Sequence, residues 1–215
     1  MAPYDYNRDA DPDVTDVETW WDYWQIDGRG CEFAVVAGFQ GDSRLIRGAE
    51  TLSGAPRNTP PSLCDGGPRA LLDFETPRAQ AATKAHQAFE AWNAFASAYP
   101  PARPAGDFWA RHFTDPEGYP SAMVIEDFRT QPVIEALGER PDLEELVGGD
   151  PAARFANDLE TLISDAVDEV LPTHALLTLD GRWLSVAGRE GRRYFNDYLD
   201  RLPRDALVVR VLYHG

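Results

Sequence analysis

Two histidines near the carboxyl end of the sequence are the side chains placed best for joint chemistry. His174 precedes the apolar stretch 175–179, and His214 follows the last apolar stretch, 206–213. If these stretches pair as antiparallel neighbours, both imidazoles lie at one end of a sheet, where they can bind a metal or exchange protons. The alternative, which we favour, is that each is a hydrogen-bonded histidine at a strand end.

A second group combines arginines with an aromatic ring. Arg182 and Trp183 follow the dipeptide Asp180–Gly181, so an arginine that can bind an anion stands beside a ring that can stack on a ligand. The structural alternative, which we again favour, is that Asp180 builds a turn and Trp183 packs on a half-buried strand.

Three further arginines open a predicted helix over 191–202 and form the best candidate binding patch: Arg189, Arg192 and Arg193. Guanidinium groups grip phosphate or carboxylate in a fork geometry, although arginines also occur on solvated helix faces. Cations at a helix N-terminus oppose the helix dipole, and this small cost favours an acidic partner. That partner is another subunit or the acidic segment 142–169 of the same chain.

Common catalytic signatures are missing from the sequence. It contains no GxxxxGK[ST], GxGxxG, HExxH, CxxC or GxSxG motif, and its two cysteines do not make a disulfide framework. We therefore assign no catalytic residue, metal or cofactor.

The charge is unevenly distributed. The net charge is −16 with a pI near 4.5, which disfavours direct binding to nucleic acid. Residues 1–20 carry −5 and 142–169 carry −8, whereas 181–210 hold seven arginines and four acids, for +3. Neither an apolar run of about 18 residues nor a signal peptide is present, so we expect a cytoplasmic protein that does not enter membranes.

The hydrophobic pattern predicts the α+β class, with a mixed or antiparallel sheet covered by amphipathic helices in a two-layer sandwich. One helix starts at a Thr76 cap and buries Ala85, Phe89, Trp92, Ala96 and Tyr99, and a second runs over 151–170. Asp180–Gly181 predicts a hairpin over 173–188, which shares a sheet with the closing strand 206–214. We expect a disordered acidic segment at 1–16 and a single domain over 17–215.

Short motifs in the last 90 residues resemble a family of uncharacterised actinobacterial and actinophage proteins. The matching positions are Phe128, Gln131 and Pro132; Asp180, Gly181 and Trp183; and Leu202, Pro203 and Asp205. The chain departs from that family in the loop after the hairpin and in its ending, Leu212 to Gly215. The resemblance implies a fold and a provenance, and no activity.

These observations favour a non-enzymatic interaction protein that binds a protein partner or itself. Two alternatives stay open at this point. One is a small metal-assisted hydrolase or nuclease that uses carboxylates and histidine, and the other is a protein that binds a small anionic ligand through Trp183 and the arginines near it.

Overall fold

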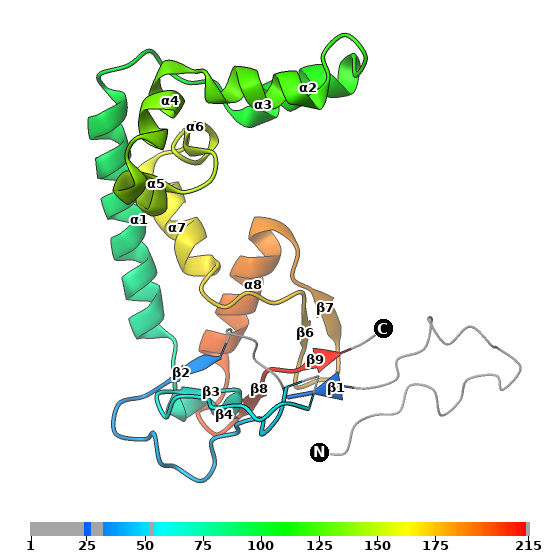
Figure 1. The fold of residues 1–215 in the computed structure, drawn as a ribbon. Coiled ribbons are helices and arrows are strands. Elements are labelled where there is room, and N and C mark those ends of the chain that lie inside the picture. The colour runs from blue at the N-terminus through cyan, green and yellow to red at the C-terminus, as the bar shows by residue number, and fades with distance from the viewer. Residues whose placement is uncertain (1–23, 27–31, 52–53, 214–215) are drawn as a thin grey trace, which may run out of the picture. The chain divides into compact units, whose positions relative to one another are not determined.

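The computed structural model describes residues 24–26, 32–51 and 54–213 (Figure 1). The predicted acidic segment at 1–16 and His214 lie outside the described residues. Where the sequence predicts a single domain over 17–215, the chain divides into two compact units. Unit 1 comprises the residues up to Pro77 and from Leu171 onward, and unit 2 is Arg78–Val170.

A three-stranded antiparallel sheet forms the centre of unit 1. β2 (Phe33–Val35) lies between β3 (Leu63–Cys64) and β5 (Leu72–Asp73). Phe33 and Val35 are buried on one face of β2, and the Phe33 ring packs 5.8 Å from the ring of Phe74. This alternation of buried and half-buried positions is typical of a strand with one face on the core.

The closing part of the chain pairs with early strands of unit 1. β8 (Leu207–Val209) pairs with β4 (Gly66–Pro68), which the 3-10 turn η2 (Arg69–Leu71) follows, and β9 (Leu212–Tyr213) pairs with β1 (Trp24–Gln25). The prediction that the hairpin and the closing strand share a sheet is therefore wrong. The reason is local: Gly66 has no side chain, so the backbone of Val208 approaches it more closely than a Cβ would allow.

Unit 2 is helical around one main core. The helices around this core are α1 (Glu75–Ala96), α4 (Pro132–Gly138), α5 (Pro141–Val147), α6 (Pro151–Arg154) and α7 (Leu159–Asp168). The first three residues of α1 belong to unit 1. The predicted apolar stripe of α1 is confirmed, because all five of its residues belong to this core. The predicted cap is corrected: Asp73 Oδ1 accepts a hydrogen bond from the Thr76 amide at 2.9 Å, so the capping side chain belongs to Asp73.

The helix predicted over 151–170 is interrupted. α6 ends at Arg154, and α7 starts after Asp158, whose side chain accepts a hydrogen bond from the Thr161 amide. Asn and Asp side chains compete with the helical backbone and favour such starts, which explains the break. Phe155 remains in the core, and Asp168 is also buried, so the acids of the segment 142–169 are not all exposed to solvent.

A second, smaller core joins α2 (Ala105–Thr114) to α3 (Ser121–Arg129) through Phe108, Tyr119 and Val124. With helices and small antiparallel sheets, the chain confirms the predicted α+β class. No helix within the described ranges combines the length and the apolar character needed to cross a membrane.

Candidate functional site

The hairpin predicted at Asp180–Gly181 is present in unit 1. β6 (Ala175–Leu177) pairs with β7 (Trp183–Ser185) in a two-stranded antiparallel ribbon. The Thr178 amide donates to the Arg182 carbonyl at 2.9 Å and closes a loop in which Gly181 has φ +80°. A left-handed glycine in this place is typical of three-residue hairpin loops.

Side chains of the turn lock its shape. The hydroxyl of buried Thr178 donates to Asp180 Oδ1, and Arg182 Nε donates to Asp180 Oδ2 at 2.8 Å. The Thr178 hydrogen bond, and then the charge of Arg182, lower the pKa of Asp180. The same carboxylate raises the pKa of Arg182, so this arginine is held as a cation at the turn.

Helix α8 (Gly188–Arg201) supports the hairpin. The Leu179 amide donates to the hydroxyl of Tyr198 at 2.8 Å, and the Tyr198 ring stacks on Tyr194 at 6.4 Å. Phe195 and Leu199 are buried on the adjoining side of this helix, and Figure 1 shows α8 beside β6 and β7. The ribbon is thus anchored through its turn.

The two faces of the ribbon differ in exposure, and the exposed one carries two large apolar residues beside Ser185. Thr178 and Val186 are buried and Leu176 and Leu184 half-buried on one face, whereas Leu177 is 58% and Trp183 48% exposed on the other. Leu177 and Trp183 are register partners. Backbone hydrogen bonds join Thr178 to Arg182 and His174 to Val186. Because hydrogen-bonded and non-hydrogen-bonded pairs alternate along an antiparallel ladder, Leu177 and Trp183 form a non-hydrogen-bonded pair. Side chains approach closest at such pairs, so Leu177 and Trp183 form one surface.

Leu179 extends this surface into the turn, where it is 66% exposed. We call Leu177, Leu179 and Trp183 the hairpin face. Of these three residues, only Trp183 is predicted as a candidate from the sequence. The signal for the others is the run Ala175 to Leu179, in which apolar residues occupy successive positions and so fall on both faces of a strand.

The other candidate residues lie along the same segment without converging on a cavity. His174 is exposed at the open end of the ribbon, about 14 Å of strand away from Arg182. Its carbonyl accepts a hydrogen bond from Val186. Arg189 and Arg193 are exposed and Arg192 is half-buried in the first turns of α8, at spacings of three and four that place them on one side of the helix.

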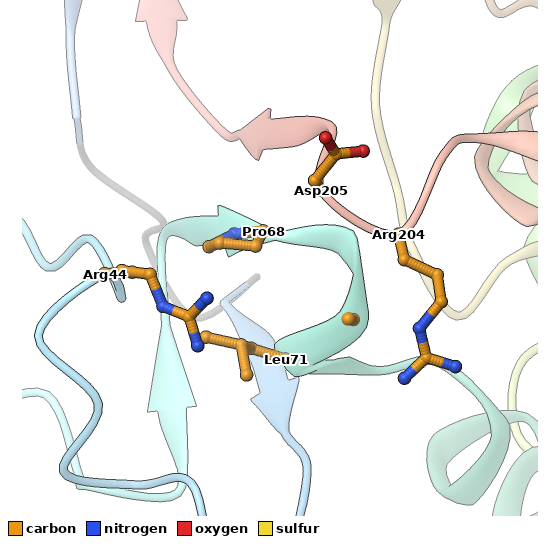
Figure 2. A pocket seen from close by; sticks show the side chains of 6 residues that line it. Arg44, Pro68, Leu71, Arg204 and Asp205 are labelled. Atoms are coloured by element: carbon orange, nitrogen blue, oxygen red, sulfur yellow. The ribbon is translucent and has the colours of Figure 1, made fainter.

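A depression of about 420 Å³ elsewhere in unit 1 contains none of these residues. Figure 2 shows Arg44 and Arg204 on opposite sides of it, with Pro68 and Leu71 between them. Arg44 Nη2 already contacts Asp42 Oδ2 at 2.7 Å, so one of the two cations is neutralised by its own neighbour. Within the described part of the chain, no three His, Cys, Asp or Glu side chains are grouped to hold a metal ion.

Comparison with known proteins adds no relative: no family model, curated protein or solved structure matches the chain.

Proposed function

We propose that this protein is a non-enzymatic interaction protein that binds a protein partner or another copy of itself through the hairpin face. The observation that carries this proposal is the inverted pattern of the ribbon. Leu177, Leu179 and Trp183 occupy the side of β6 and β7 where an exposed ribbon ordinarily carries polar side chains.

The free energy of burying apolar surface favours a state in which a partner covers the hairpin face. Covering roughly 200 Å² of apolar surface contributes about 5 kcal/mol before the costs of association. A two-stranded ribbon is marginally stable by itself, and packing on a partner also stabilises it. Tryptophan is among the residue types that most often dominate binding energy at interfaces, and Trp183 lies in the hairpin face.

The charge of the segment that carries the hairpin face indicates which charges the partner's contact surface should have. Residues 181–210 carry +3 in a chain of −16, so this segment is the basic part of an acidic protein. Complementary potentials favour a partner whose contact surface carries acids around an apolar centre.

The test compares the full chain with two variants, Leu177→Ser and Trp183→Ser, and with a control, Phe39→Ser. Phe39 is also an exposed aromatic residue of unit 1, but it lies outside the hairpin. Oligomeric state is measured by sedimentation velocity, and retention of partners by affinity purification from an extract of the source organism.

We expect both hairpin variants to weaken association by about 5- to 30-fold, because each removes one apolar anchor worth about 1–2 kcal/mol. Phe39→Ser should behave as the wild type, and circular dichroism should show that all three variants are folded. If the wild type is a monomer that retains nothing, or if all variants bind alike, the proposed function is wrong.

A further inference from the structure

Unit 2 presents an exposed aromatic surface of its own at the end of α2. Phe113 is 77% exposed and stacks on Trp109 with ring centroids 6.0 Å apart. We call Trp109 and Phe113 the α2 shelf.

Contacts beneath the α2 shelf hold it in place. The ring of His112 packs against both aromatic rings, and its Nδ1 lies 2.8 Å from the carbonyl oxygen of Tyr119. Tyr119 is buried, donates its hydroxyl to Asp127 at 2.6 Å and carries the Arg111 guanidinium over its ring at 3.9 Å. A rigid aromatic pair loses little side-chain entropy on binding and therefore makes an efficient anchor.

The unit that carries the α2 shelf is opposite in charge to the segment that carries the hairpin face. Residues 78–170 hold seventeen acidic and seven basic residues, for a net charge of −10, against +3 for residues 181–210. Asp115 and Glu117 follow directly after Phe113, so acids border the aromatic surface.

On these grounds, and resting on the proposed function, we propose that the protein self-associates head to tail. The hairpin face of one copy binds the α2 shelf of a second copy, with the α8 arginines on the side of the acidic unit 2. Contact between two hairpin faces would instead bring two closing segments of +3 each together, which disfavours it. A head-to-tail contact joins different surfaces and produces rings or open chains rather than closed symmetric dimers.

The test uses the full chain with Trp183→Ser, which leaves the α2 shelf intact, and Phe113→Ser, which leaves the hairpin face intact. We expect the wild type to show masses that rise with concentration in sedimentation velocity. Each variant alone should be monomeric, at least about tenfold weaker in association. An equimolar mixture of the two variants should form a 1:1 dimer, in which the hairpin face of Phe113→Ser binds the α2 shelf of Trp183→Ser. No larger assembly should form, because the two surfaces left at the ends of this dimer are the altered ones.

Salt and a control variant complete the experiment. Raising NaCl from about 0.05 to about 0.5 M should weaken wild-type association several-fold, since screening reduces the attraction between opposite charges. Phe39→Ser should assemble as the wild type does, because it leaves both the hairpin face and the α2 shelf intact.

Three outcomes overturn the inference, and they differ in what they say of the proposed function. If only Trp183→Ser is monomeric and mixing restores nothing, hairpin faces bind each other and the proposed function stands. If the wild type stays monomeric yet retains another protein in a Trp183-dependent way, the proposed function also stands. If neither variant changes mass or retention, both proposals fail.

Discussion

At the scale of single residues, a fully buried carboxylate holds unit 1 together. Asp65 is 0% exposed, and its Oδ2 accepts hydrogen bonds from Arg57 Nη1 at 2.8 Å and from the Gly48 amide at 2.7 Å. Arg57, with its side chain 7% exposed, also donates to Glu32 at 2.8 Å. Asp65 and Glu32 thus hold Gly48 and Arg57 beside the strands β2 and β3.

Replacing Asp65 by asparagine should therefore be costly. Asp65→Asn keeps the size of the side chain but removes the negative charge that pairs with the buried guanidinium of Arg57. Breaking a buried ion pair lowers the free energy of unfolding by about 3–5 kcal/mol. Urea unfolding of the full chain measures this loss. The control is Asp107→Asn, which breaks the exposed pair with Arg103 and should cost at most about 0.5 kcal/mol. Equal losses in the two variants would contradict a structural role for the buried network.

The ion pair between the half-buried Asp42 and Arg44 makes stability depend on pH. Hydrogen bonds from the Arg44 side chain, and then from its amide, lower the pKa of Asp42 from 3.8 to about 2. Because the pKa is lower in the folded chain than in the unfolded chain, the ionised carboxylate stabilises the fold above about pH 4. This stabilisation is lost as the pH falls towards 2.

Asp42→Asn tests this dependence. We expect the variant to melt at a lower temperature than the wild type at pH 6, and the gap between the two melting temperatures to close between about pH 4 and pH 2. Differential scanning calorimetry across that range provides the measurement. A gap that stays constant with pH would show that the Arg44 contact does not lower the pKa of Asp42.

At the scale of elements, the β4–β8 pair depends on a glycine. A Cβ built on Gly66 would lie 2.4 Å from the Val208 carbonyl oxygen and 2.9 Å from the Val209 Cα. Gly66→Ala must push β8 away, so we expect a loss of about 1–3 kcal/mol in urea unfolding. The matched control is Gly106→Ala in α2, where a Cβ meets nothing within 4 Å. That change should be neutral or stabilise by up to about 1 kcal/mol, since alanine favours helix.

Element by element, local sequence signals succeeded where one short-range interaction decides the structure. The Asp180–Gly181 hairpin, the apolar stripe of α1 and the helix α8 follow from turn chemistry and periodicity. The prediction over 151–170 was wrong because Asp158 starts a new helix inside an apolar pattern that continues across the break. Periodicity reports which residues are buried, and it does not report whether the backbone between them is continuous.

At the scale of the whole molecule, the sequence distributes charge unevenly between the two compact units. Unit 2 holds a net charge of −10, while the closing segment of unit 1 carries +3. Association driven by these charges is expected to depend on salt, which is why the head-to-tail contact is tested at two ionic strengths.

The sequence by itself determined the α+β class, the hairpin turn, the charge asymmetry and the residues of the candidate patch around Arg182 and Trp183. Each of these depends on residue type and on neighbours a few positions away. Only the tertiary structure decided that β8 pairs with β4, that Asp65 is buried beside Arg57, and that Leu177 and Leu179 face outward with Trp183. These outcomes depend on which distant segment covers which face, and an apolar strand residue has the same local pattern whether its cover comes from its own chain or from a partner.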